Sequence, residues 1–294
     1  MASIRIPATS ANLGVLFDKG AVALDVFENT IYVEKAVETK LHIQGEGRDI
    51  LPYGKENLVY RAIEHFYRET GRRMPGLSLG MQNGIPLSKG LGSSAACIAG
   101  GIFAANELEG KILNLNEMIM MAAGMEGHGD NVCAALAGGI VLFEGNGFER
   151  IPEHGAAGFI LFIPESTLST KKSREVLPSE YDEQTLATAR RLEHEMIRAL
   201  RECDYEKAGA LMQEDVLHQP YRKSLIPYWD DVISASAAAG SWGTSLSGAG
   251  PAMISICPRE AVDGIAGRIK MSIDKKYGLN IIGCGVNGRG ISHV

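Results

Sequence analysis

The segment Pro86-Leu-Ser-Lys-Gly-Leu-Gly-Ser-Ser-Ala-Ala96 decides the fold of this chain. Its two glycines allow the backbone to turn tightly, two serines follow, and the run of small residues after them predicts a helix. The first N–H groups of such a helix have no backbone partner, and the helix dipole favours negative charge beside them. The segment therefore predicts a loop that binds phosphate.

Two better-known phosphate motifs do not fit this segment. Its glycines match the loose dinucleotide pattern G-x-G-x-x-G/A, but that fold needs an acid at the end of a second strand, whereas Glu107 and Glu109 fall in a helical context. A Walker A loop is excluded because the Gly-Lys-Ser/Thr triplet is missing. Another G-x-G-x-x-G at 283–288 has too little chain after it for a crossover helix. We therefore prefer a helix N-terminus carrying Ser93 and Ser94, which suits phosphate and Mg²⁺.

The composition is that of an ordinary globular protein. The chain has 294 residues, 45% of them hydrophobic and 22% charged, a net charge of −6 and a pI near 5.7. A nucleic-acid surface would normally be basic, so we expect no nucleic-acid partner. The absence of an early apolar segment and of a long apolar run predicts neither a signal peptide nor a membrane span, which makes the cytoplasm the default location.

The cysteines give no sign of a metal site or of a disulfide framework. They are odd in number, widely spaced and without a C-x-x-C pair, and most have apolar neighbours. We expect buried, reduced thiols at Cys97, Cys133, Cys203, Cys257 and Cys284.

The order of predicted elements indicates an α+β protein. Alternation and β-branched residues predict strands over 2–7, 22–27, 29–37, 40–44, 77–81, 158–163 and 279–286, and a strand–turn–strand over 242–257. Helical spacing predicts helices over 57–70, 95–105, 115–125, 183–202, 204–217, 229–239 and 260–277. There is no steady βαβ rhythm. The turn-rich stretch 144–157 indicates a domain boundary.

Two further segments are rich in polar groups that a plain core would not need. Pro7-Ala-Thr-Ser-Ala-Asn-Leu-Gly14 follows a strand and leads to the carboxylate of Asp18; alone it could be an ordinary turn. Glu126-Gly-His-Gly-Asp-Asn131 supplies carboxylates of the kind that Mg²⁺ prefers. The alternative for this second segment is a helix N-cap formed by Asp130 or Asn131.

Two arginines and one glycine turn complete the set. Arg174 and Arg222 each follow other polar residues, and a guanidinium group is the preferred two-point partner of a carboxylate. Either arginine could instead be exposed to solvent. The segment Gly243–Pro251 is a glycine-rich turn between two strands, which alone would be a hairpin.

In this order, these segments resemble motifs of the GHMP small-molecule kinases, and within them of the homoserine kinases. Pro7–Gly14 is similar to the first family motif, Pro86–Ala96 to the phosphate loop and Leu246–Pro251 to the third motif. The resemblance runs from residue 4 to about residue 252, which is most of the chain.

Three segments narrow the resemblance to homoserine kinases. Glu126–Asn131 is similar to the E-G-H-P-D-N motif of that group, and Arg174–Pro178 and His218–Arg222 match its R-x-x-L-P and H-Q-P-Y-R motifs. Two positions depart from the pattern. The family's G-P-G-F-D is here Gly14-Val15-Leu16-Phe17-Asp18, and Gly129 replaces a proline. These departures keep open a different acceptor such as L-threonine, or a GHMP-fold protein that binds ligand without turnover.

The resemblance implies a two-domain fold. Residues 1–155 would form the ATP-binding N-terminal domain, similar to ribosomal protein S5 domain 2, and residues 156–294 a ferredoxin-like α/β C-terminal domain. It also implies ATP-dependent phosphorylation of the side-chain hydroxyl of L-homoserine, in threonine biosynthesis, by direct in-line transfer assisted by Mg²⁺. A homodimer is the assembly often found in the family.

The resemblance also assigns the site. The contacts to ATP would come from Asn57 at the adenine and from Pro86, Lys89, Gly90, Leu91, Gly92, Ser93, Ser94, Ala95 and Ala96 around the phosphates. Mg²⁺ would be held by Ser94 and Glu126.

The acceptor would be bound through its three polar groups. Arg174 and Arg222 would hold the carboxylate, Asp18 with Asn12 the ammonium, and His128 and Asn131 would lie beside the hydroxyl. We expect Asn131 to position that hydroxyl and Asp130 to orient the loop or the metal shell. An ordinary aspartate pKa of about 3.9 makes Asp130 a weak base for an alcohol, although a base role stays open.

Overall fold

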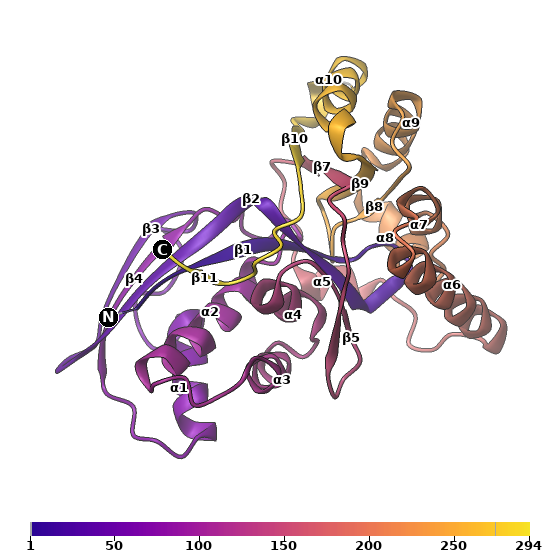
Figure 1. Cartoon of the computed structure of the whole chain (residues 1–294). Coiled ribbons are helices and arrows are strands. Elements are labelled where there is room, and N and C mark those ends of the chain that lie inside the picture. The colour runs from indigo at the N-terminus through magenta and orange to yellow at the C-terminus, as the bar shows by residue number, and fades with distance from the viewer. Residues whose placement is uncertain (1, 274) are drawn as a thin grey trace.

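The computed structural model describes residues 2–273 and 275–294 and confirms the α+β class (Figure 1). The predicted domain 1–155 and the predicted helix 260–277 include residues 1 and 274, which lie outside the described residues. Within the described ranges the strands form two sheets, one of seven strands and one of four.

The larger sheet is built almost entirely from the first half of the chain. Its central order is β11-β1-β2-β4-β3, with β5 paired to β2 and β6 to β5. The pairs are antiparallel except β3 with β4. The strands are β1 (Ala2–Asn12), β2 (Leu16–Ala36), β3 (Lys40–Gly45), β4 (Gly76–Asn83), β5 (Ile140–Phe143), β6 (Phe148–Ile151) and β11 (Ser292–His293).

Four helices cover one face of this sheet (Figure 1). They are α1 (Leu58–Glu69), α2 (Ser93–Leu108), α3 (Leu115–Glu126) and α4 (Asp130–Ala137). Helix α2 lies against both the sheet and α1, and its small residues make this close packing possible. A Cβ on Gly100 would lie 2.7 Å from the Ile31 side chain of the sheet, and one on Gly101 would lie 2.6 Å from Ala62 of α1. The phosphate loop thus leads into a helix that packs closely against both the sheet and α1.

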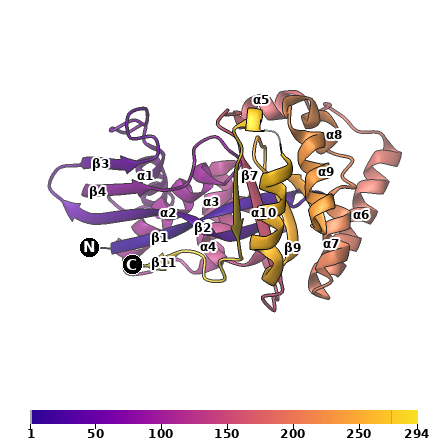
Figure 2. The ribbon, with the colours of Figure 1, turned by 90° about the horizontal axis from the view of Figure 1, so that it is seen from above.

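The smaller sheet and its helices lie beside the first half (Figure 2). Its order is β10-β7-β9-β8, all antiparallel, with β7 (Ala157–Ile163), β8 (Gly243–Leu246), β9 (Met253–Pro258) and β10 (Asn280–Cys284). The α-helices are α5 (Thr170–Glu175), α6 (Glu183–Arg201), α7 (Tyr205–Met212), α8 (Gln219–Arg222), α9 (Trp229–Ala239) and α10 (Val262–Ser272). Short 3₁₀ turns occupy Lys223–Leu225, Arg259–Ala261 and Lys275–Tyr277.

Several predicted boundaries were wrong. The two strands predicted over 22–37 are one strand, β2, whose pairing with β1 shifts register between Pro7 and Ala8. The helix predicted over 204–217 ends at Met212, because the chain then turns around the carboxylate of Asp215. The turn-rich stretch 144–157 contains β6, and the sequence analysis missed α5, α8 and β11.

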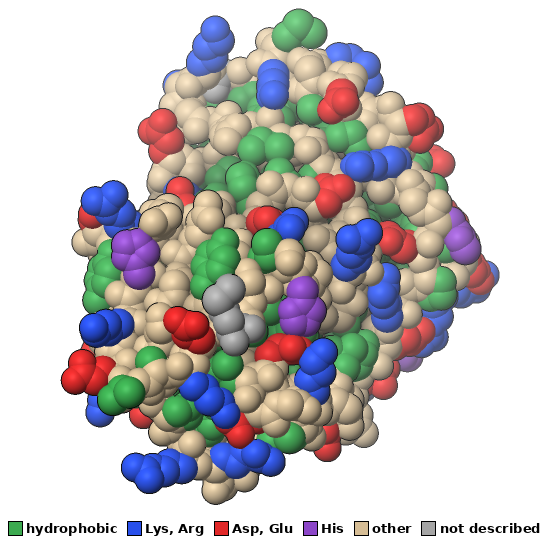
Figure 3. All heavy atoms as spheres, turned by 60° about the vertical axis from the view of Figure 1, so that its left-hand side comes forward, with side chains coloured by type: hydrophobic (Ala, Val, Ile, Leu, Met, Phe, Trp, Pro, Cys, Tyr) green, Lys and Arg blue, Asp and Glu red, His purple; other side chains and the backbone are tan. Residues whose placement is uncertain are grey.

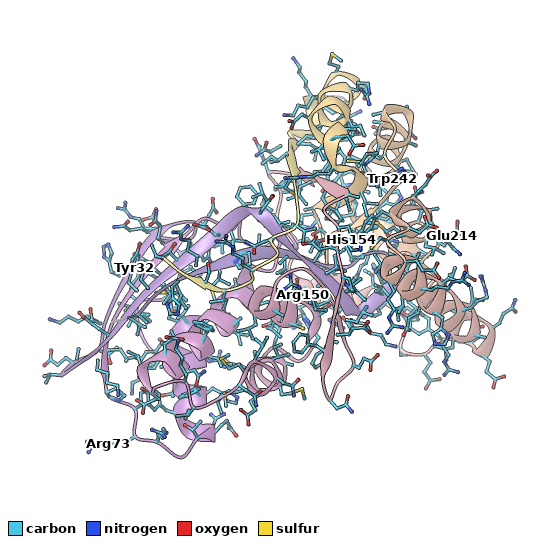
Figure 4. The ribbon with its side chains drawn as sticks, in the orientation of Figure 1. Tyr32, Arg73, Arg150, His154, Glu214 and Trp242 are labelled. Carbon is cyan, nitrogen blue, oxygen red and sulfur yellow. The ribbon has the colours of Figure 1, made fainter. Side chains whose placement is uncertain are left out.

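The C-terminal segment ties the two halves together. Gly285 N–H donates to Asp25 Oδ1 of β2 at 2.6 Å, and Arg150 donates to the carbonyl of Gly288 at 2.7 Å (Figure 4). The chain then ends as β11 beside β1. The change of sheet falls between Ile151 and Ala157, while the domain division 1–155 and 156–294 stays a prediction.

The surface and the cysteines agree with the composition. In the view of Figure 3, acidic and basic side chains are interspersed, so this face carries no basic patch. Among the described residues no helix is long and apolar enough to cross a membrane.

All five cysteines are unpaired, as predicted; Cys97 and Cys203 are half-buried rather than buried.

The packing of α2 predicts a stability difference between two glycine variants. Gly101→Ala places a methyl group 2.7 Å from the backbone carbonyl of Val59, which cannot swing away. Overpacking should lower the free energy of unfolding by about 1–2 kcal/mol even after the gain in helix propensity. Gly124→Ala is the matched control, because its added Cβ in α3 meets nothing within 4 Å.

Gly124→Ala should raise the free energy of unfolding by up to about 1 kcal/mol. Urea unfolding of both variants and the wild type measures the difference. Equal stability of the two variants would contradict the packing of α2 against α1.

Candidate active site

One cavity of about 650 Å³ collects the segments singled out in the sequence. This volume is in the range of small-molecule sites. Its lining includes the end of β1, the phosphate loop, the start of α4, α5, α8 and the turn between β8 and β9. All predicted site residues line it except Ala96, which is buried on the opposite side of the first turn of α2. Ala96 is therefore not placed to touch a ligand in the cavity.

The phosphate loop is held from two sides by close backbone contacts. Gly90 and Gly92 have φ angles of 79° and 71°, the left-handed region that favours glycine. A Cβ on Gly90 would lie 2.2 Å from the carbonyl oxygen of Ser247, and one on Gly92 would lie 1.9 Å from Thr9 Oγ1. Hence the glycines serve the contact with neighbouring loops as well as the turn.

The first motif and the third motif are bonded to this loop and to each other. Thr9 N–H donates to the carbonyl of Leu91 at 3.1 Å, and the hydroxyl of Ser247 lies 2.7 Å from the carbonyl of Gly90 and 2.9 Å from Ser10 Oγ. Asn12 Nδ2 donates to the carbonyl of Gly248 at 2.8 Å. The segment Gly243–Pro251 is the predicted turn between two paired strands, β8 and β9, and Pro7–Asn12 lies in β1 rather than in an ordinary turn; both segments also bind the phosphate loop.

The Glu126–Asn131 segment joins α3 to α4. Helix α3 ends at Gly127 in the left-handed conformation, and Gly129 is the N-cap of α4, so the alternative that Asp130 or Asn131 is the N-cap is wrong. Asp130 Oδ1 accepts from His128 Nδ1 at 2.7 Å and from Asn131 N–H at 2.7 Å. The bond to Asp130 raises the pKa of His128.

The glycine that replaces the family's proline has a steric reason. A Cβ on Gly129 would lie 2.3 Å from the ring of Phe143, at the end of β5. The ring therefore occupies the space that a proline or alanine side chain would need. In this chain the ring of Phe143 packs against the loop, whereas in the family pattern a rigid proline stands at this position.

Ser94 and Glu126 form a pair at the start of α2. Ser94 Oγ donates to Glu126 Oε2 at 3.0 Å, and burial raises the pKa of Glu126. A hydroxyl and a carboxylate oxygen are hard ligands of the kind that Mg²⁺ takes, one or two from the protein and the rest from water and phosphate. The residues present thus fit Mg²⁺ beside the phosphate loop.

Opposite charges meet at the other end of the cavity. Arg174 makes two hydrogen bonds to the carboxylate of Asp18, at 2.8 and 3.1 Å. Arg222 is 1% exposed, and its guanidinium carbon lies 5.2 Å from the centre of the Phe17 ring. Burial, with the nearby charge of Arg174, lowers the pKa of Arg222 to about 10. The expectation that either arginine could simply be solvent-exposed is wrong for Arg222.

His218 holds this end together, a role that the sequence analysis did not assign. It accepts at Nδ1 from Arg222 at 3.2 Å, so its Nε2–H donates to the carbonyl of Gly14 at 2.9 Å. Its ring also stacks on Phe17. Burial lowers the pKa of His218. The side chain is therefore a neutral link between α8 and the first motif.

Lys89 and Asn57 lie in the cavity wall and also have structural partners. Lys89 Nζ donates to the carbonyls of Glu165 and Ser166, and burial lowers its pKa. Asn57 is the N-cap of α1 and accepts at Oδ1 from the backbone of Val59. Lining residues that the sequence analysis did not single out include Ile50, Leu51, Pro52, Thr167 and Leu168.

Comparison with known proteins agrees with this geometry. The family models described as GHMP kinases N terminal domain and GHMP kinases C terminal match residues 57–139 and 196–271. The homoserine kinase of Synechocystis sp. is 38% identical over 90% of this chain and 88% of its own, and that of Caldicellulosiruptor bescii is 41% identical over 87% and 84%.

Solved structures give the same result. The crystal structure of homoserine kinase from Cytophaga hutchinsonii has a TM-score of 0.91 and 27% identity, and covers 100% of this chain and 97% of that one. The mevalonate kinase of Methanococcus jannaschii, at 18% identity, has a TM-score of 0.71 over 97% of this chain and 98% of its own, which shows the fold alone.

The chain belongs to the GHMP kinases, and the two-domain fold expected from the resemblance is that of this family. Within the family it belongs with the homoserine kinases, whose sequences it matches over most of its length.

The buried histidine predicts how stability depends on pH. Because the pKa of His218 is lower in the folded state, the unfolded chain binds a proton at a higher pH than the folded chain does. The contribution of His218 to the free energy of unfolding is therefore complete above the ordinary pKa of 6.5 and is lost as the pH falls below that value. Asp215, Arg222 and Asp18 are the charged groups around it.

His218→Asn should flatten the fall in the free energy of unfolding between about pH 6.5 and 5. His194→Asn is the control, because His194 is exposed in α6. Denaturant unfolding at several pH values measures the slopes, and comparison with wild type cancels the opposite contribution of His128. The same slope in His218→Asn and wild type would show that His218 is not held neutral.

Proposed function

We propose that this chain transfers the γ-phosphoryl group of ATP to the side-chain hydroxyl of L-homoserine, giving O-phospho-L-homoserine for threonine biosynthesis. The observation that carries the proposal is that one cavity is lined both by the phosphate loop and by the Asp18–Arg174 pair and Arg222. The names of the relatives support homoserine over the L-threonine alternative and over binding without turnover.

The acceptor end suits an amino acid with both of its charges. Asp18 and Arg174 are paired with each other in this structure. A ligand that separates them must therefore offer a cation to Asp18 and an anion to Arg174. A zwitterion does this: its carboxylate goes to Arg174 and Arg222, and its ammonium to Asp18, with Asn12 holding the Asp18 backbone at 3.1 Å. A ligand with one charge leaves Asp18 or Arg174 without a partner, which costs binding free energy.

Phosphoryl transfer needs positioning and charge stabilisation more than covalent chemistry. Backbone N–H groups of the phosphate loop and the side chains of Ser93, Ser94 and Lys89 bind the ATP phosphates. Asn131 and His128 hold the acceptor hydroxyl. Asp130 orients the ring of His128 and holds the backbone N–H of Asn131 through its two short bonds, and the hydroxyl proton leaves late or to phosphate.

Mg²⁺ is held by Ser94 and Glu126 in this proposal, and supplies charge stabilisation to the phosphates when bound. The raised pKa of Glu126 means that the proton competes with the metal for this carboxylate at a higher pH than it would for an ordinary glutamate. We place the reaction in the cytoplasm, and a homodimer stays a prediction.

An acceptor panel tests the function. With ATP and Mg²⁺, L-homoserine should give the highest kcat/KM for ADP release, ahead of L-threonine. The matched controls are 3-amino-1-propanol, which lacks the carboxylate, and 4-hydroxybutyrate, which lacks the ammonium. Each should lose about 100-fold or more in kcat/KM, because a charged group of the site, Asp18 or the arginines, is left without its partner. A higher kcat/KM with L-threonine would overturn the choice of acceptor.

Replacement of the carboxylate tests the metal site. Glu126→Gln should raise the Mg²⁺ concentration needed for half-maximal activity by about 10–100-fold. Glu144→Gln is the control, because Glu144 is exposed beyond β5 and does not line the cavity. The measurement is an Mg²⁺ titration of initial rates at fixed ATP. An unchanged Mg²⁺ requirement in Glu126→Gln would remove this residue from the metal site.

A further inference from the structure

Thr9 has a position that the proposed roles leave unexplained. It is fully buried near the end of β1, yet its side chain is polar. Its hydroxyl donates to Asn131 Oδ1 at 2.7 Å, and its own backbone N–H donates to the carbonyl of Leu91 at 3.1 Å. Thr9 therefore bonds at the same time to the phosphate loop and to the side chain expected to hold the acceptor hydroxyl.

The second contact of Thr9 makes this link stiff. Its Oγ1 lies 1.9 Å from where a Cβ on Gly92 would be, so the hydroxyl rests directly against the backbone of the phosphate loop. A β-branched side chain has few χ1 rotamers, and close packing leaves it little freedom. Thr9 thus holds Asn131 against the phosphate loop, where Asn131 Oδ1 itself lies 3.3 Å from the same Cβ position on Gly92.

The bond also determines which end of the Asn131 amide is free. If the amide were turned over, its oxygen would lie near Asp130 Oδ1, where two oxygens that accept hydrogen bonds would repel each other. In the observed orientation Nδ2 lies 3.5 Å from Asp130 Oδ1, while Oδ1 is occupied by Thr9. Asn131 accordingly offers the cavity an N–H donor, while its oxygen is held by the hydroxyl of Thr9.

We propose that Thr9 is a positioning residue that fixes Asn131 as a hydrogen-bond donor to the acceptor hydroxyl and sets its distance from the phosphate loop. This rests on the proposed function. It follows that a lone pair of the hydroxyl oxygen not used by Asn131 attacks phosphorus, while the hydroxyl proton leaves late or to phosphate, as in the proposed function.

Thr9→Val tests the proposal, because valine keeps the shape of threonine and removes the hydroxyl. We expect kcat to fall on the order of 10–100-fold, as for a reacting group displaced by about 1 Å, with KM for ATP and acceptor changed less than about threefold. Thr9→Ser keeps a hydroxyl and should restore kcat to within about threefold of wild type.

Two controls separate positioning from a general loss of structure. Thr244 of β8 has another buried threonine hydroxyl, which is bonded to Ser255 of β9, and it does not line the cavity. Thr244→Val removes this hydroxyl and should leave kcat unchanged. Asn131→Ala should make Thr9→Val silent, because Thr9 acts through Asn131. The double variant should therefore have the kcat of Asn131→Ala alone.

Failure of the proposed role of Thr9 can be told apart from failure of the proposed function. A wild type that does not phosphorylate L-homoserine overturns that function, and the Thr9 variants are then measured with the acceptor of the panel that is turned over. Should no acceptor be phosphorylated, the side-chain amide signals of Asn131 in NMR spectra replace kcat: Thr9→Val should shift them and Thr9→Ser should not. Full kcat in Thr9→Val, additive effects in the double variant or unshifted signals would overturn the role of Thr9.

Discussion

The close approach of three loops is the constraint on which the site depends. The phosphate loop contacts the end of β1 and the turn after β8 at distances that leave no space for a side chain at Gly90 or Gly92. Thr9, Ser10 and Ser247 satisfy the polar groups at this junction. Because the three loops come from three distant parts of the chain, the two halves must both fold before the cavity exists. The site is therefore a product of tertiary structure as much as of its motifs.

Charge is handled locally in an acidic protein. With a net charge of −6, the chain as a whole repels a nucleotide and attracts no carboxylate. The cavity compensates with helix and loop N–H groups at one end and with Arg174 and Arg222 at the other. Arg222 stays buried because Phe17, His218 and backbone carbonyls surround its guanidinium group. Asp18 pairs with Arg174 and so offsets one of the two positive charges of the acceptor site.

Prediction from sequence succeeded where a feature is local and failed where it depends on packing. Helix periodicity predicted α1 and α6 to within two residues, and the glycine–serine pattern identified the phosphate loop. The single long β2 was missed because its pairing is irregular near Pro7, and β11 because two residues carry no pattern. Ala96 was included with its loop neighbours, although helix geometry turns its side chain into the core. Gly129 was seen as a departure, while its reason, the ring of Phe143, lies in another element.

By itself, the sequence determined the fold class, the phosphate loop, the family resemblance and a set of site residues of which all but Ala96 line the cavity, because each of these depends on residue types at short spacing. Only the tertiary structure decided how those residues are paired. It joined Asp18 to Arg174, placed His218 between Arg222 and Gly14, and set Thr9 against both Gly92 and Asn131. The physical reason is that a hydrogen bond or an ion pair requires the distance between two groups to be correct to within a few tenths of an ångström. For residues far apart in sequence, only the packed fold sets that distance.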